Sequence, residues 1–346
     1  MHKIWNELHI EVPIIQAGMA GGITTPELVA EVANNGGLGT IGAGYMSDAD
    51  LKEAIQQTKA LTDKPFAVNV FTDNLEAFSS EVGDMQQFLN RYRQELELEP
   101  GERSIKVNDY LQEKIYCIIN ENIPIVSTAF GVLSSMLIER LKENDITLMG
   151  MATNVHEAKQ LEEAGYDMVV VQGYEAGGHR GTFQLQSYPD GCNIGLMVLL
   201  QDVLESVFIP VVAAGGIYHH DQIEGILKMG ACGVQLGTRF LVAEEAGTNK
   251  AYKQALIKAK TEDTIITKVI SGRPARGITN RLVRELTEND IPLLPFPIQN
   301  ECTKDIRGAA KEYAHSELQS LWAGQGVSHI TKEESVKDIF DSLTAN

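Results

Sequence analysis

A histidine lies inside a glycine-rich run at residues 172–181. The run reads Gln-Gly-Tyr-Glu-Ala-Gly-Gly-His-Arg-Gly and directly follows the apolar segment 168–171. Histidine titrates near neutral pH, so His179 is a candidate general base or a cationic anchor for an anion. An isolated loop histidine is commonly a plain surface residue. The flanking glycines, which let a loop fold closely over a flat ligand, and the neighbouring Arg180 favour the chemical role.

Two glycine-containing pairs follow later apolar segments. Gly215-Gly216 comes directly after residues 210–214, and Gly237-Thr238 comes after residues 233–236. Glycine has no Cβ, so its backbone N–H can approach a phosphate oxygen closely, and Thr238 adds a hydroxyl. Either pair alone could serve simply to form a tight turn between a strand and a helix. The two pairs together predict a phosphate site.

Polar side chains and one more glycine run end other apolar segments. Asn69 and Gln172 would point inward, where a buried amide needs a partner. Each can contact a heterocyclic ligand or, equally well, the neighbouring backbone. Gly18 and Met19 begin a run that can either lie against a flat ring or form an ordinary turn. Glu175 can orient His179 or remain a solvated loop carboxylate.

The elements that must position these residues alternate along the chain. Thr25 followed by Pro26 predicts a helix start, and comparable helical stretches separate eight apolar segments. The segments are 13–18, 38–43, 66–71, 123–128, 146–151, 168–173, 210–216 and 233–238. Apolar strands joined by helices indicate a parallel sheet, and eight units over about 240 residues predict a (β/α)₈ TIM barrel. Active sites of such barrels lie at the C-terminal ends of the strands, where the candidate residues stand.

Two regions depart from the alternation. Residues 72–110 are polar and Glu-rich, which predicts a partly helical insertion after the third strand. Residues 242–346 contain no further strand-helix series. We therefore expect a barrel over residues 1–241 and a C-terminal extension over 242–346 that packs on it as helices and loops. Either region can supply a lid or a subunit contact, so a homo-oligomer is compatible with the sequence.

The composition restricts the partners. The 346-residue chain carries a formal net charge of −18, which disfavours nucleic acid and anionic membranes as partners. No signal segment and no apolar run of about 20 residues is present, so we expect a cytoplasmic protein. Its four cysteines (Cys117, Cys192, Cys232 and Cys302) show no metal-binding spacing. A small-molecule substrate and no metal are the expectation.

Five short segments resemble the nitronate monooxygenase family, formerly called 2-nitropropane dioxygenases. They are Ile-Gln-Ala-Gly-Met at 15–19, Glu-Ala-Gly-Gly-His-Arg-Gly at 175–181, Ala-Ala-Gly-Gly-Ile at 213–217, Gln-Leu-Gly-Thr at 235–238 and Trp-Ala-Gly-Gln at 322–325. The resemblance extends across essentially the whole chain, in matching order. It implies FMN at the barrel mouth, with the phosphate held after strands seven and eight. The implied FMN contacts are Asn69, Gln172, Gly177, Gly215, Gln235, Leu236, Gly237 and Thr238, with Gly18 and Met19 near the ring, and His179 is the implied catalytic residue.

The resemblance implies oxidation of an alkyl nitronate by O₂ to a carbonyl compound and nitrite. A neutral nitroalkane would first lose an α-proton, with His179 as the base. A close relative, the flavin-dependent enoyl-acyl carrier protein reductase, typically has a hydrophobic residue in place of Arg180, which ranks NAD(P)H-dependent enoyl reduction second. A flavin-free phosphate-binding barrel, acting as a lyase or a sensor, is the alternative outside redox chemistry.

Overall fold

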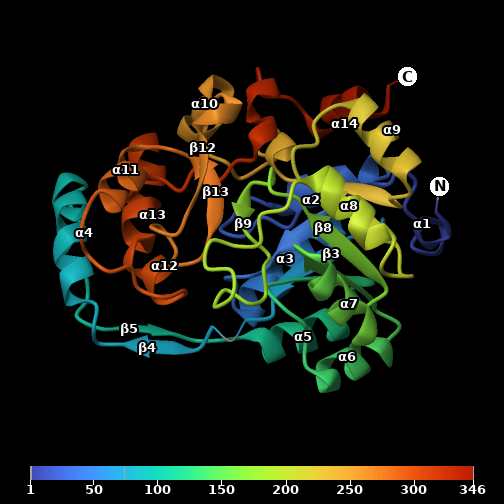
Figure 1. Ribbon diagram of the computed structural model, residues 1–346, viewed down its shortest axis with the longest axis horizontal. Helices are drawn as coiled ribbons and strands as arrows, with labels where there is room; N and C mark the ends of the chain where they lie inside the picture. Colours follow the sequence, from blue (N-terminus) through green and yellow to red (C-terminus); the bar gives the residue numbers. More distant parts are fainter. Residues whose placement is uncertain (1, 74, 346) are drawn as a thin grey trace.

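Eight parallel strands close into a barrel surrounded by helices, as the computed structural model shows for residues 2–73 and 75–345 (Figure 1). The strands are β1 (Ile14–Gln16), β2 (Thr40–Gly42), β3 (Ala67–Phe71), β6 (Ile125–Ala129), β7 (Thr147–Ala152), β8 (Met168–Gln172), β10 (Val211–Ala214) and β11 (Gly233–Leu236). They pair in the order β1-β11-β10-β8-β7-β6-β3-β2. The backbone of Leu38 closes the ring, because its N–H donates to Ile14 at 2.9 Å and its carbonyl accepts from Gln16 at 3.0 Å. The predicted TIM barrel is confirmed.

Burial on both faces explains the apolar strands. On β3, Val68 and Val70 pack outward against the helices, whereas Ala67 faces the barrel interior beside Met149 of β7. The short helix α1 (Lys3–Glu7) closes the N-terminal end of the barrel. Its Trp5 is fully buried there and donates an indole N–H to the Cys232 carbonyl at 2.6 Å. This packed floor leaves the opposite end of the barrel for ligands.

The helix signals of the sequence are confirmed where the structure tests them. Thr25 caps α2 (Pro26–Asn34) by accepting from the Leu28 N–H, and Pro26 occupies the first turn. The remaining helices around the barrel are α3 (Asp48–Leu61), α5 (Leu111–Asn120), α6 (Ser135–Lys142), α7 (Val155–Glu163), α8 (Leu196–Leu204), α9 (His220–Met229) and α14 (Val336–Thr344). The last of these comes from the end of the chain and packs against α2 and α9. The chain thus leaves the barrel after β11 and returns to complete its helical ring.

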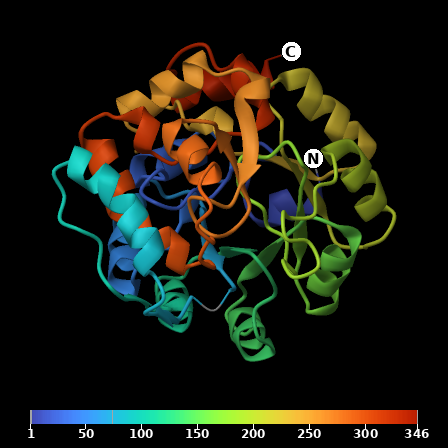
Figure 2. The same cartoon turned by 60° about the vertical axis from the view of Figure 1, so that its left-hand side comes forward.

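The insertion and the C-terminal extension meet in one lobe beside the barrel (Figures 1 and 2). The insertion supplies β4 (Ala77–Ser79), α4 (Gly83–Glu95) and β5 (Ile105–Val107), while residue 74 of it lies outside the described residues. The extension supplies α10 (Lys250–Lys258), β12 (Thr264–Thr267), β13 (Ala275–Ile278), α11 (Arg281–Thr287), α12 (Ile298–Cys302) and α13 (Lys304–Glu312). Leu89 and Tyr92 of α4 share an apolar core with Leu282 and Ile306. We call this unit, residues 77–107 and 250–318, the lobe.

A small antiparallel sheet joins the lobe to the barrel. Strand β9 (Gly178–His179), in the loop after β8, pairs with β13, and β13 pairs with β12. The sequence predicted helices and loops for the extension, so this sheet is a departure from the expectation. Over the described residues no helix is long and apolar enough to cross a membrane, and no cluster of side chains suited to a metal ion is found.

Candidate active site

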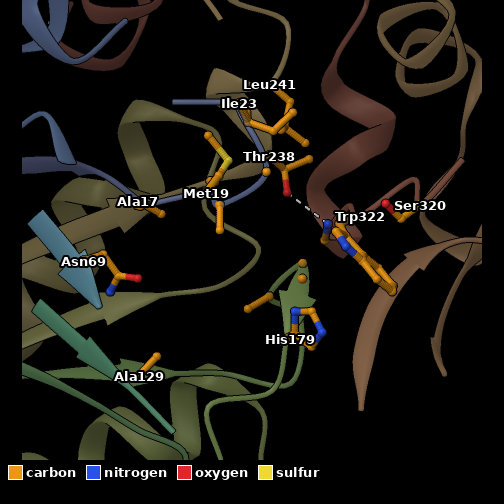
Figure 3. A pocket seen from close by; sticks show the side chains of 18 of the residues that line it. Ala17, Met19, Ile23, Asn69, Ala129, His179, Thr238, Leu241, Ser320 and Trp322 are labelled. Atoms are coloured by element: carbon orange, nitrogen blue, oxygen red, sulfur yellow. Dashed lines mark hydrogen bonds between the residues drawn. The ribbon is translucent and has the colours of Figure 1, made fainter. Parts of the chain in front are cut away.

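One cavity of about 470 Å³ opens at the C-terminal ends of the barrel strands, between the barrel and the lobe. All of the residues predicted for the site line it. They are Gly18, Met19, Asn69, Gln172, Gly177, His179, Gly215, Gly216, Gln235, Leu236, Gly237 and Thr238. Figure 3 shows Met19, Asn69, His179 and Thr238 around this space. Residues at the ends of five strands, β1, β3, β8, β10 and β11, therefore converge where the barrel geometry predicts a site.

His179 is held by the lobe. Its backbone pairs with Ala275 of β13, and its imidazole Nε2 lies 2.8 Å from the Ser271 hydroxyl. That hydroxyl is also 3.1 Å from the Arg273 carbonyl, to which it can donate. The protein around the ring, together with the positive charges of Arg273 and Arg307, lowers the pKa of His179 to about 3. The imidazole is therefore neutral at physiological pH.

Gln172 and Arg180 shape the loop that carries His179. The Gln172 amide donates to the His179 carbonyl at 2.9 Å and accepts from the Gly181 N–H at 2.8 Å. Arg180 is fully buried and donates to the carbonyls of Gly173 and Gln172 at 2.8 and 3.1 Å. Its guanidinium does not line the cavity. Arg180, whose position next to His179 favoured a chemical role for that histidine, thus stabilises the conformation of the loop.

Backbone donors gather at one end of the cavity, in the loops after β10 and β11. Gly215 and Gly216 adopt φ values of 122° and 68°, a region that side-chain-bearing residues rarely occupy. Within the described chain, the N–H groups of Gly215, Gly216, Gly237 and Thr238 have no protein acceptor. The Thr238 hydroxyl accepts from the Gly324 N–H at 2.9 Å, as Figure 3 shows, and keeps its own proton free to donate. Such a set of donors suits a phosphate group.

The remaining polar side chains predicted for the site, Asn69 and Gln235, differ in how free they are to hydrogen-bond a ligand. The Asn69 amide donates to the Ser127 hydroxyl at 2.9 Å, so part of its hydrogen-bonding capacity is used. Gln235 of β11 is buried, lines the cavity, and has no side-chain hydrogen bond to any described residue. A buried amide of this kind requires a partner. Gln235 is therefore the side chain best placed to bind a polar edge of a ligand.

Aromatic rings form the wall near His179. The centroid of Trp322 lies 5.4 Å from that of His179, and those of Phe130 and Phe296 lie 6.0 Å away. Tyr45 packs edge-on against Phe71 at 5.3 Å. This wall provides a largely apolar surround in which polar contacts with a substrate are strong.

The chain is similar to known proteins over almost its whole length. A family model described as nitronate monooxygenase matches residues 2–346. The chain belongs to the nitronate monooxygenase family. Within that family, a probable nitronate monooxygenase of Staphylococcus haemolyticus is 42% identical over 343 residues, covering 99% of this chain and 96% of that protein. A probable nitronate monooxygenase of Staphylococcus aureus is 43% identical over 333 residues, 93% of this chain and 92% of that protein.

Solved structures agree with the family assignment. A nitroalkane oxidase from Streptomyces ansochromogenes has a TM-score of 0.90 and 36% identity, covering 99% of this chain and 96% of its own. FabK from Thermotoga maritima has a TM-score of 0.77 and 29% identity, covering 99% and 95%. The nitronate monooxygenase resemblance expected from the sequence is therefore confirmed, and so is its relation to the enoyl reductase.

Several residues at the site of this nitronate monooxygenase family member were not predicted from the sequence. Ser271 contacts His179 from the lobe, the charge of Arg273 lowers the pKa of His179, and Arg307 lines the cavity from α13. The Ser-Gly-Arg-Pro run at 271–274 was a local signal for a turn, but nothing local points it toward residue 179. Glu175 does not touch His179 by hydrogen bond, because its carboxylate accepts from the Leu196 N–H at the start of α8.

Proposed function

We propose that this chain is an FMN-dependent nitronate monooxygenase, which oxidises alkyl nitronates with O₂ to carbonyl compounds and nitrite. The observation that carries the proposal is the position of His179. A neutral imidazole lines the same cavity as a set of free backbone donors after β10 and β11. The family assignment supports an enzyme of this kind.

The donor chemistry of the cavity fits FMN. The N–H groups of Gly215, Gly216, Gly237 and Thr238 would hold its phosphate, and the Gln235 amide would bind the polar edge of the ring system. Met19 and Gly177 line the same space and would contact the ring faces. Bound FMN supplies an acceptor for the electrons of the substrate and a route for them to oxygen.

The chain itself contributes binding, orientation and proton control. As a neutral group, His179 can donate one hydrogen bond to a nitronate oxygen without adding a counter-charge. Ser271 fixes the ring, and the aromatic wall excludes water from the reacting groups. An imidazole with a pKa of about 3 is a weak base, whereas efficient general bases have pKa values near the working pH. This favours preformed nitronates over neutral nitroalkanes as substrates.

The test is anaerobic flavin reduction in the purified protein. Ethylnitronate and propionate-3-nitronate are compared with NADH and NADPH, and nitrite is then measured in air. We expect bleaching by nitronates with nitrite release and no bleaching by the nicotinamides. Bleaching by NAD(P)H alone would instead support enoyl reduction, the activity suggested by the likeness to FabK. A colourless protein that takes up no flavin would exclude both nitronate oxidation and enoyl reduction, and would support the flavin-free phosphate-binding barrel.

A further inference from the structure

A short segment near the C-terminus lies against the loops that carry the free backbone donors. Its first residue, Gly324, donates its N–H to the Thr238 hydroxyl at 2.9 Å. A Cβ added at Gly324 would lie 2.9 Å from the Gly177 nitrogen and 3.3 Å from the Thr238 hydroxyl, so a glycine is needed for this close approach. We call this segment, residues 324–330, the strap.

The strap also lies on the loop after β10. A Cβ added at Gly326 would lie 3.2 Å from the Tyr218 ring and 3.5 Å from the Gly216 carbonyl oxygen. Gln222 of α9 holds the same loop, because its side chain accepts from the Tyr218 N–H at 2.9 Å and donates to the Gly216 carbonyl at 3.1 Å. The loop that presents the free Gly216 N–H is therefore held by both α9 and the strap.

Two stacked rings connect the strap to this loop. The imidazole of His329 lies on the ring of Tyr218, with centroids 3.6 Å apart and planes 9° from parallel. Tyr218 lines the cavity, whereas His329 is exposed. Among the described residues, neither side chain has a hydrogen bond or an ion pair. Stacking is therefore the interaction through which the two residues act on each other.

The other polar contacts of the strap reach different parts of the molecule. The Gln325 N–H donates to the Glu175 carbonyl at 2.9 Å, in the loop after β8. The Thr261 hydroxyl, from the lobe, donates to the Gln325 carbonyl at 2.9 Å and lies 2.9 Å from the Ser328 hydroxyl. None of these bonds involves the loop after β10. The stacked pair is therefore the side-chain interaction that joins the strap to that loop.

We propose that Tyr218 and His329 are positioning residues for the phosphate of the bound cofactor. By holding the strap against the loop after β10, the two rings keep the backbone donors of that loop directed into the cavity and slow the release of the phosphate. The inference rests on the FMN binding of the proposed function and is independent of the nitronate chemistry.

The test compares FMN with riboflavin, which has the same ring system without the phosphate. The Kd of each flavin for the flavin-depleted protein is measured by fluorescence quenching, and the rate of FMN release is measured after dilution. Variants of one binding site differ mostly in the dissociation rate, so FMN release is the more sensitive readout. A pair that acts on the phosphate alters FMN binding and leaves riboflavin binding nearly unchanged.

His329→Ala removes one ring of the pair. We expect the Kd of FMN to rise by about 3- to 10-fold with a correspondingly faster release, the range for a lost aromatic pair, and the Kd of riboflavin to change by less than about 2-fold. His329→Phe keeps a ring on Tyr218 and should restore most of the affinity. His156→Ala is the matched control, because His156 is an exposed histidine at the start of α7, and this variant should bind both flavins as the wild type does.

Tyr218→Leu tests the partner ring. If the two rings act as a pair, Tyr218→Leu combined with His329→Ala should weaken FMN binding no more than either change alone. Additive losses would show that the two residues act separately and would overturn the pair. If Tyr218→Leu fails to fold, the His329 variants decide, because they alter an exposed side chain.

Three results would overturn the inference. They are unchanged FMN binding in His329→Ala, an equal loss for FMN and riboflavin, and a His329→Phe protein that binds FMN as weakly as His329→Ala. If flavin binds but no nitronate bleaches it, the nitronate chemistry fails, while the two Kd values still decide the inference.

A protein that takes up no flavin would contradict the proposed function. The rise in melting temperature caused by inorganic phosphate then replaces the Kd, because a ligand raises the melting temperature when it binds the native protein. The rise should be smaller in His329→Ala than in the wild type and in His329→Phe. An equal rise in all three would overturn the inference.

Discussion

At the scale of the residue, the Ser271 hydroxyl limits the protonation of His179. Serine has one hydroxyl proton, and the Arg273 carbonyl, 3.1 Å away, competes for it with the imidazole Nε2 at 2.8 Å. If the carbonyl receives that proton, Nε2 must carry its own and Nδ1 keeps a free lone pair. In that state the free Nδ1 can only accept a proton. If Ser271 instead donates to Nε2, Nδ1 carries the ring proton and can donate it to a nitronate oxygen.

Replacing His179 by Asn separates these two roles. Asparagine can hydrogen-bond a nitronate but cannot act as a base. Because an imidazole with a pKa of about 3 is a weak base, we expect activity on neutral nitroalkanes to fall by about 10²-fold, the low end for general-base catalysis, and activity on nitronates to fall by less than about 10-fold. The measurement is kcat/KM for nitroethane and for ethylnitronate. Because the pKa of His179 is lowered to about 3, its neutral form persists at every pH above about 4, and the nitronate profile of the wild type should show no histidine step between pH 5 and 8. Equal losses on both substrates would exclude the role as base.

At the scale of the element, the loops after β10 and β11 depend on backbone conformation more than on side chains. Gly216 has a φ of 68°, and its N–H has no protein acceptor within the described chain. A Cβ there would approach the Glu175 side chain to 3.0 Å. The donors of this loop are therefore preserved only while residue 216 can adopt the left-handed conformation.

Gly216→Val tests this requirement. A β-branched residue in this region costs about 1–2 kcal/mol, so the loop should rearrange and flavin affinity should fall by about tenfold or more. The measurement is the Kd of FMN for the flavin-depleted protein, by fluorescence quenching. Gly225→Ala is the matched control, because Gly225 is an exposed residue within α9 whose added Cβ meets no atom within 4 Å. Unchanged FMN affinity in Gly216→Val would remove this loop from the phosphate site.

The sequence was sufficient for the elements whose signals are local. The eight apolar segments, the Thr25 cap and the polar strand ends depend on neighbouring residues, and the structure reproduces them. The pairing of β9 with β13 could not be predicted, because two-residue β9 has no periodicity of its own and its partner lies about a hundred residues away. Ser271 and Arg307 could not be predicted for the same reason. Their role depends on the distant residues that they meet at the cavity and not on their neighbours in sequence.

At the scale of the whole molecule, the lobe and the barrel share the cavity between them. Arg93 of α4 is buried and donates to Asp305 at 2.7 Å and to the Cys302 carbonyl at 2.8 Å. Arg93 thereby links the insertion (residues 72–110) to the C-terminal extension (residues 242–346). Arg93, a residue of the insertion, therefore helps to hold α13 of the extension in place beside the outer cavity.

Arg93→Met should loosen the lobe while the barrel stays folded. Loss of the buried partner of Asp305 and Cys302 is expected to cost about 1–3 kcal/mol, since Asp305 is itself half exposed. The two tryptophans report separately, Trp5 on the barrel floor and Trp322 on the cavity wall. Urea unfolding of single-tryptophan variants should show an earlier Trp322 transition. Arg91→Met, at a half-exposed neighbour, should change it by less than about 1 kcal/mol, and coincident transitions in Arg93→Met would contradict a separately stabilised lobe.

The attachment of β9 to β13 also has a consequence for the order of events on the ribosome. The eighth barrel strand has been synthesised once residue 236 is made, but the residues that hold His179 and seal the cavity, from Ser271 to Gly324, are still to come. At typical elongation rates of 5–20 residues per second, the rest of the chain takes on the order of 5–20 s. During that interval the nascent barrel presents an open mouth. Capture of a cofactor is therefore expected to be completed only after residues 271–324 have folded onto the barrel and closed the cavity.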